Sequence, residues 1–242
     1  MEMFDLDCNI GLLDLSLYLK KQKMLVVTDL HIGLEEALNS QGFLVPRQQH
    51  KDMKEKLRRI ISKIKPDEIV ILGDLKHEFG KISKQEWKDT LDMIDFFQER
   101  TKEIILIKGN HDTILGPLAG KKNLKILDYY FKDGYYFCHG NNVHSDDDFK
   151  KAHTILIGHQ HPAITIGDEY RRERYKCFLD GQYDDKRLIV IPCFSPISKG
   201  TDVSKEKLLS PFLKKNNVDS FEVFVCGDKI YSFGKLGKIR ET

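Results

Sequence analysis

Cysteine is scarce and scattered in this sequence of 242 residues. The five cysteines form no C-x-x-C pair and no close cluster: Cys8, Cys138, Cys177, Cys193 and Cys226. An odd number of separated thiols argues against a disulfide framework, and the missing pairs argue against a thiolate zinc site. We therefore expect reduced thiols and a cytoplasmic protein.

Long apolar runs are also missing. No stretch approaches the roughly 18 apolar residues that are needed to span a bilayer. The N-terminus carries acidic residues, whereas a secretory signal would have a basic start followed by an apolar segment. Both absences predict that the protein has no membrane partner.

A strong charge of one sign is absent as well. The 39 Lys and Arg residues are balanced by 37 Asp and Glu residues, which leaves a formal net charge of +2. This balance argues against a strongly basic nucleic-acid clamp, although it is compatible with a local basic face. With 40% apolar and 31% charged residues, the chain has the composition of a globular protein. Without repeats or a clear linker, it is expected to form a single domain over residues 1–242.

Short apolar runs rich in β-branched residues are present and alternate with helical patterns. Runs of this kind are typical of buried strands, and they cover residues 24–28, 68–72, 103–107, 135–138, 154–157 and 188–191. Apolar residues recur at helical spacing over 53–64, and again over 87–97 after a capping-box sequence from Ser83 to Glu86. The alternation predicts an α/β architecture. Residues 220–225 and 229–233 additionally predict a terminal hairpin.

Polar side chains follow five of the predicted strands directly. They are Asp29 and His31, then Asp74, then Asn110, His111 and Asp112, then His139, and finally His159 and His161. Each motif is weak by itself, because D-x-H arises by chance and Gly-Asp is commonly a turn. In open α/β sheets, however, ligands gather at the carboxyl ends of the strands. The joint arrangement therefore predicts one site at one rim.

The donor types in this set indicate a metal centre. Imidazole, carboxylate and amide oxygen, without thiolate, suit Mn, Fe, Zn or Ni. The donors are too many for one ion and about the right number for two. On extended backbone, Asp29 and His31 would point the same way, as would His159 and His161. Two such ions activate water and neutralise charge during displacement at phosphorus.

The ordered motifs resemble those of the calcineurin-like metallophosphoesterases. The matching segments are Asp29-x-His31, Gly73-Asp74, Gly109-Asn110-His111-Asp112, His139-Gly140 and Gly158-His159-x-His161. The sequence around the first two segments is most similar to the archaeal SbcD-related and bacterial ligase-associated DNA phosphoesterases. The resemblance implies a four-layer α/β sandwich, in which two mixed β-sheets are flanked by helices and the metals lie at the carboxyl ends of the strands.

The resemblance also implies a role for each motif residue. Seven residues would be metal ligands: Asp29, His31 and His161 for one ion, Asn110, His139 and His159 for the other, and Asp74 as a bridge between both. His111 would face the scissile phosphate and assist the leaving group, and Asp112 would orient His111. We expect two divalent ions, Mn²⁺ or else Fe, Zn or Ni. A metal-bridging hydroxide would then hydrolyse a phosphodiester, with DNA as the expected substrate.

Other functions stay open at this point. A phosphodiesterase or phosphatase for a small nucleotide is the main alternative, because the near-neutral charge gives DNA no independent support. A non-catalytic scaffold of the same fold would be expected to lack ligands, whereas all seven are present here. A single-metal sensor would leave the paired ligand sets and His111 unexplained. The oligomeric state is not predicted.

Several further residues have two interpretations each. His77 and Glu78 either line the pocket or form an exposed loop. Arg47 either grips a substrate phosphate or is an exposed loop arginine. The segment 195–200 is expected to return to the site, with no role assigned to Ser195. Three histidines match no motif and are expected to be surface or structural residues: His50, His144 and His153.

Overall fold

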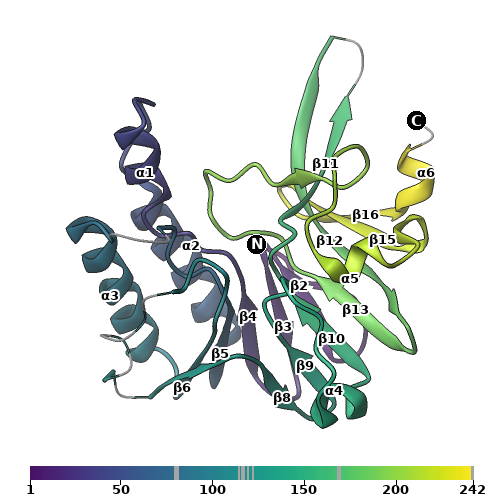
Figure 1. Cartoon of the computed structure of the whole chain (residues 1–242), viewed down its shortest axis with the longest axis horizontal. Helices are drawn as coiled ribbons and strands as arrows, with labels where there is room; N and C mark the ends of the chain where they lie inside the picture. The colour runs from purple at the N-terminus through teal and green to yellow at the C-terminus, as the bar shows by residue number, and fades with distance from the viewer. Residues whose placement is uncertain are drawn as a thin grey trace.

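The computed structural model describes residues 1–78, 82–113, 115, 118, 120–121, 123–167 and 170–240. Two β-sheets pack face to face, and helices cover their outer faces (Figure 1). Both sheets contain parallel and antiparallel pairs. Among the described residues, no helix has the length and apolar character needed to cross a membrane.

Among the described residues, the first sheet contains seven strands in sequence order. They are β1 (Phe4–Asp5), β2 (Ile10–Leu13), β3 (Ser16–Leu19), β4 (Met24–Val27), β5 (Glu68–Leu72), β6 (Glu103–Ile107) and β7 (Leu124–Leu127). The pairs from β1 to β4 are antiparallel, whereas the pairs from β4 to β7 are parallel. The carboxyl ends of β4, β5 and β6 therefore share one edge.

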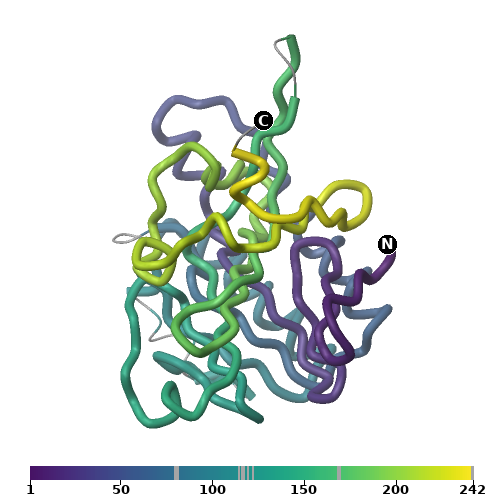
Figure 2. The backbone as a smooth tube through the Cα atoms, turned by 90° about the vertical axis from the view of Figure 1, so that its right-hand side faces the viewer, coloured from purple at the N-terminus to yellow at the C-terminus, as the bar shows by residue number. Residues whose placement is uncertain are grey.

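The second sheet contains nine strands within the part of the chain that the structure describes. They are β8 (Tyr130–Lys132), β9 (Tyr135–Phe137), β10 (Thr154–Ile157), β11 (Pro162–Gly167), β12 (Arg172–Tyr183), β13 (Lys186–Val190), β14 (Thr201–Asp202), β15 (Glu222–Cys226) and β16 (Ile230–Lys235). The order is β14-β11-β12-β13-β10-β9-β8, and β15 joins β12 to β16. Strands β9, β10 and β13 run parallel. Figure 2 shows the hairpin of β11 and β12 extending beyond the rest of the chain.

Helices lie on the outer side of each sheet. Those that follow strands of the first sheet are α1 (Leu34–Ser40), α2 (Gln49–Ile64) and α3 (Lys84–Gln98). The later ones are α4 (Asp147–Lys151), α5 (Pro211–Lys214), the 3₁₀ turn η2 (Val218–Ser220) and α6 (Leu236–Arg240). In α3, Ser83 caps the helix by accepting the backbone N–H of Glu86 at 3.0 Å. In a capping box the glutamate would also accept the backbone N–H of the capping serine. Here the Glu86 carboxylate accepts instead the backbone N–H groups of His77 and Glu78, in the loop after β5.

Three apolar cores separate the four layers. Successive side chains of a strand point to opposite faces, so Leu25 and Val27 pack toward α2 and α3 whereas Val26 packs between the sheets. Phe137 and Leu156 meet Val26 from the second sheet. A third core lies under α4 to α6. The expected four-layer sandwich of two mixed sheets is thus confirmed.

The predicted strands agree closely with the structure. The boundaries of β5, β6 and β10 are those predicted, and β15 with β16 forms the expected terminal hairpin. Short strands at the N-terminus and the long strand β12 were not predicted. The five strands that lead to the candidate site come from both sheets, three from the first and two from the second.

Candidate metal centre

The two sheets bring their candidate ligands together across one shared edge. Asp29 follows β4, and its Oδ2 atom accepts the backbone N–H of His159, which follows β10, at 3.1 Å. Asn110 follows β6, and its Oδ1 atom lies 3.0 Å from Nε2 of His139, which follows β9. These two contacts join the first sheet to the second. The site therefore exists only in the folded chain, since its parts are far apart in sequence.

One group of donor atoms converges around Asp29, His31 and His161. The Nε2 atoms of His31 and His161 are 3.2 Å apart, and Oδ1 of Asp29 is 3.3 Å from the same His161 nitrogen. Within the described part of the chain, this Asp29 oxygen is buried without a hydrogen-bond partner. Ligands bound at about 2.0–2.2 Å to one ion stand at comparable mutual distances. The orphaned oxygen and the facing nitrogens therefore fit a bound cation.

A second group forms around His139. Its Nε2 atom is 3.4 Å from Oδ2 of Asp74, and one donor atom each from Asp74, His139 and His159 lie within 4.8 Å of one another. The Nδ1 atom of His139 donates to the Leu72 carbonyl at 2.7 Å, which leaves Nε2 to face the site. Oδ2 of Asp74 also lies 3.9 Å from Nε2 of His31. Asp74 thus stands between the two groups.

The charge states of these side chains suit metal binding. Burial raises the pKa of Asp29, but the surrounding histidines outweigh it and hold that pKa well below its usual value. Burial lowers the pKa of His31 to about 3 and that of His159 to about 4. Burial also disfavours charge on His139, yet the carboxylates of Asp74 and Asp29 raise its pKa to about 9. A cation would take the place of the His139 proton, because a metal needs the neutral imidazole.

The backbone conformation of the candidate ligand residues differs from the extended conformation that the sequence predicted. Five of them lie in the left-handed region, with φ between +46° and +61°: Asp29, His31, Asp74, His159 and His161. The predicted extended backbone was therefore wrong. The chain turns sharply after β4, β5 and β10. The turns after β4 and β5 bind each other, because the N–H of His31 donates to the Asp74 carbonyl at 2.9 Å. Such strained residues persist only where surrounding structure holds them, which is common at functional sites.

Two motif glycines make this close approach of the loops feasible. A Cβ atom on Gly109 would lie 2.1 Å from Oδ1 of Asp74. A Cβ atom on Gly158 would lie 1.9 Å from Oγ1 of Thr28, which itself donates to Oδ2 of Asp29 at 2.8 Å. Any larger residue would displace a carboxylate of the site.

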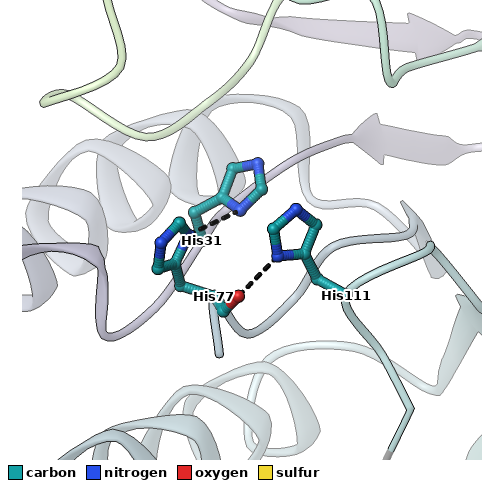
Figure 3. A group of neighbouring side chains, drawn as sticks. All are labelled: His31, His77 and His111. Atoms are coloured by element: carbon teal, nitrogen blue, oxygen red, sulfur yellow. Dashed lines mark hydrogen bonds between the residues drawn. The ribbon is translucent and has the colours of Figure 1, made fainter. Parts of the chain in front are cut away.

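His77 lines the site together with His31 and His111. Its Nδ1 atom is 3.5 Å from Nδ1 of His31, and its ring stacks on that of His111 with centroids 5.3 Å apart. The carbonyl of His77 accepts a hydrogen bond from Nδ1 of His111, and Figure 3 shows the three side chains gathered in this way. Of the two interpretations of His77, the structure favours pocket lining.

Asp112 holds loops of the site in place. Its buried carboxylate accepts the backbone N–H of Gly109 at 3.0 Å and that of Leu75 at 3.4 Å. Burial raises the pKa of Asp112, against the effect of the Gly109 N–H. These contacts tie the loop after β5 to the loop after β6. Asp112 thus supports the segment that carries His111, whereas the His111 ring is bonded to the His77 carbonyl.

The loop after β13 returns to the site, as expected. Oγ of Ser198 lies 3.4 Å from Nδ1 of His161. Ser195 accepts a hydrogen bond from Nε2 of Gln49 at 2.7 Å, and the same Gln49 nitrogen donates to the His31 carbonyl at 3.2 Å. Neither Gln49 nor this role of Ser195 was predicted. A serine and a glutamine separated by more than a hundred residues carry no recognisable spacing.

Cys193 was also missed, because the sequence predicted a site without sulfur. Its Sγ atom donates to the Asp29 carbonyl at 3.0 Å and lies within 4.8 Å of ring nitrogens of His31 and His161. Burial raises the pKa of the thiol to about 12. Cys193 is therefore a protonated thiol beside the first donor group.

The remaining candidates have partners of their own. Arg47 is exposed and forms an ion pair with Glu36 at 2.8 Å. The three unassigned histidines contact neighbouring side chains: His50 with Asp92, His144 with Asp146 and Tyr136, and His153 with Thr154. These contacts agree with surface or structural roles for the three histidines.

Known proteins resemble this chain in sequence pattern and in fold. The sequence model of the calcineurin-like phosphoesterases matches residues 22–228. Among solved structures, the nuclease MPE of Pseudomonas putida is 18% identical with a TM-score of 0.66, and the match covers 96% of this chain and 99% of that one. That similarity shows a shared fold.

Two other solved structures align with lower scores. Yfce, a phosphoesterase from E. coli, is 12% identical with a TM-score of 0.42, covering 88% of this chain and 97% of that one. Vps29 of Entamoeba histolytica, complexed with zinc, is 13% identical with a TM-score of 0.35, covering 86% and 96%. No curated protein matches the chain.

Proposed function

The chain belongs to the calcineurin-like phosphoesterase family, and from this premise we propose that it is a metal-dependent phosphodiesterase that cleaves DNA. The observation that carries the proposal is Asp74, whose Oδ2 atom lies 3.4 Å from Nε2 of His139 and 3.9 Å from Nε2 of both His31 and His111. One carboxylate oxygen thus faces both donor groups and the proposed acid.

Seven side chains would hold two divalent ions, for which Mn²⁺ is the first choice. Asp29, His31 and His161 would bind one, Asn110, His139 and His159 the other, and Asp74 both. Bound there, the ions would activate water and offset negative charge on the phosphate oxygens. The assignment is supported by Oδ1 of Asp29, which is buried and has no hydrogen-bond partner in the described part of the chain.

His111 would act on the leaving group. Its backbone N–H donates to Oδ1 of Asp74 at 2.9 Å, and its Nδ1 atom donates to the His77 carbonyl. The first bond fixes the backbone of His111 and the second fixes its ring, with Nε2 3.9 Å from Oδ2 of Asp74. A proton on Nε2 can then pass to the leaving oxygen, or bind a phosphate oxygen as charge develops.

DNA as substrate rests on sequence similarity around the first two motifs. The name of the P. putida relative, a nuclease, points the same way. The sequence has nearly equal numbers of basic and acidic residues, so the substrate would be recognised at the metal edge rather than by a strongly basic protein surface.

Hydrolysis of end-labelled single- and double-stranded DNA with Mn²⁺ tests the proposal. We expect cleavage by the wild type, and a loss of about 10²-fold or more in Asp74→Asn and His111→Ala. His144→Ala, whose side chain lies among Tyr129, Tyr136 and Asp146, is the matched control and should cleave normally.

The other outcomes separate the alternatives. Hydrolysis of bis-p-nitrophenyl phosphate without DNA cleavage would favour a small nucleotide as substrate. Failure to hydrolyse either compound, in protein that binds two ions, would favour a scaffold. Full activity in both site variants would refute the mechanism.

A further inference from the structure

Two oppositely charged side chains are buried beside the site without being candidate ligands. Lys76 is 0% exposed and Glu86 is 1% exposed. Lys76 lies in the loop after β5, and Glu86 lies in the first turn of α3. Burying a charge is unfavourable by several kcal/mol unless hydrogen bonds compensate it. The partners of these two residues therefore matter.

Both residues hold the same short backbone segment. Oε1 of Glu86 accepts the N–H groups of His77 and Glu78, each at 2.9 Å. Nζ of Lys76 donates to the carbonyl of Glu78 and to the carbonyl of His111. The peptide units at 77 and 78 are thus fixed from two sides, and the backbone of His111 is fixed to the same lysine.

The fixed segment in turn orients the His111 ring. The carbonyl of His77 accepts the hydrogen bond from Nδ1 of His111. A continuous path therefore runs from the Glu86 carboxylate through the His77 peptide to the imidazole. With Nδ1 bonded in this way, Nε2 lies 3.9 Å from Oδ2 of Asp74.

The missing side chain of Gly33 leaves room for the side chain of Glu86. A Cβ atom on Gly33 would lie 2.6 Å from Cγ of Glu86, and Gly33 has φ of +95°. Burial raises the pKa of Glu86, while the N–H groups of Glu78 and His77 and the charge of Lys76 oppose that rise. Glu86 is therefore directed into the loop by close packing.

We infer that Lys76 and Glu86 form a buried clamp that positions the His111 imidazole for its action on the leaving group. The inference rests on the proposed function of His111. Both residues act through the backbone of residues 77, 78 and 111, so they are positioning residues rather than catalytic ones.

A comparison of leaving groups tests the clamp. The p-nitrophenolate released from bis-p-nitrophenyl phosphate needs little protonation, whereas the alkoxide released from the dinucleotide TpT needs a proton. In Glu86→Ala we expect kcat for TpT to fall about 10²-fold, with kcat for the aryl ester and both KM values changing less than about threefold. Glu86→Gln keeps an oxygen for the two N–H groups and should retain most of the TpT activity.

Controls separate positioning from general destabilisation. Glu68→Ala removes a glutamate at the other end of β5, where it pairs with Lys132, and should leave the ratio of the two activities unchanged. Lys76→Met should shift the ratio as Glu86→Ala does, and it replaces that variant if Glu86→Ala fails to fold. An equal loss with both substrates, or no loss, would overturn the clamp.

A second measurement keeps the clamp testable without activity. In a long-range ¹H–¹⁵N spectrum, assigned with His111→Asn, wild-type His111 should show a protonated Nδ1 atom. Glu86→Ala should lose this signature. If the wild type hydrolyses neither substrate, the proposed function fails, and an unchanged His111 signature in Glu86→Ala would overturn the clamp independently.

Discussion

The Nε2 atoms of His31 and His161 lie 3.2 Å apart where the edges of the two sheets meet. Oδ1 of Asp29 is 3.3 Å from the same His161 nitrogen. Each atom can donate a lone pair to a metal ion, and the carboxylate oxygen is buried without a hydrogen-bond partner among the described residues. Such an arrangement is unfavourable when empty of positive charge, so a cation bound there should stabilise the fold.

Addition of Mn²⁺ should therefore raise the unfolding temperature of metal-free protein. A ligand present at 100 times its Kd raises the free energy of unfolding by about 2.7 kcal/mol for each site. Calorimetry in EDTA and then in excess Mn²⁺ measures the change. Asp29→Asn should lose much of it, because the variant lacks the charged ligand of the first group.

The control for this experiment is an aspartate outside the site. Asp67 pairs with Lys102 at 3.0 Å, and Asp67→Asn should keep the full response to Mn²⁺. A wild-type response in Asp29→Asn would show that the ion binds elsewhere.

Gly109→Ala should disable the centre without replacing any of the proposed ligands. The new methyl group would lie 2.1 Å from Oδ1 and 2.4 Å from the backbone nitrogen of Asp74, so Asp74 must move. Displacement of a site residue by about 1 Å commonly reduces turnover about 10²-fold. We expect that loss in phosphodiester hydrolysis, together with fewer bound ions by elemental analysis.

Gly120→Ala is the matched substitution. A Cβ atom there meets nothing within 4 Å, so metal content and turnover should match the wild type. Two tightly bound ions in Gly109→Ala would contradict the argument.

The strands that lead to the site were predictable because they are continuous apolar runs. In β5, β6 and β10, every residue after the first is apolar. The apolar run in the sequence therefore coincides with the strand in the structure. The long strand β12 begins instead with exposed charged residues, because its hairpin extends beyond the sheet and needs no apolar face. Gly11, Asp14 and Ser16 interrupt the segment that contains β2 and β3, so it lacks the continuous apolar run that marks the other strands.

The candidate site was predictable to the extent that its residues directly follow strands. His77 follows Asp74 by three positions, and its location was left between two interpretations. Lys76, Glu86 and Gln49 contact the site through backbone groups of distant loops. No spacing in the sequence encodes such contacts, since they depend on how the sheets and helices pack.

Ser83→Ala should destabilise the start of α3. Oγ of Ser83 accepts the Glu86 N–H at 3.0 Å, and loss of such a cap lowers the free energy of unfolding by about 1 kcal/mol. Urea denaturation measures this value. Ser83→Asp retains a capping oxygen and should remain close to the wild type, so an equal loss in both variants would point to another cause.

Metal-free protein should lose stability between pH 6.5 and about pH 5. Burial lowers the pKa of His31 to about 3 and that of His159 to about 4, from 6.5 in the unfolded chain. As the pH falls through this window, the unfolded chain binds protons at both positions whereas the folded chain does not. The free energy of unfolding should fall by about 1.5 kcal/mol for each histidine.

Burial also lowers the pKa of His77, so this histidine adds to the loss, whereas His139, Asp29 and Asp74 act outside the window. The carboxylates raise the pKa of His139 to about 9, so its contribution is complete below pH 6.5 and is lost only as the pH rises. Asp29 and Asp74 have lowered pKa values, and their contributions are lost only below the usual carboxyl range near 3.8. Urea denaturation in EDTA at both pH values measures the slope. The double variant His31→Asn/His159→Asn should flatten it, whereas His153→Asn should not, and a wild-type slope in the double variant would assign the acid lability to other groups.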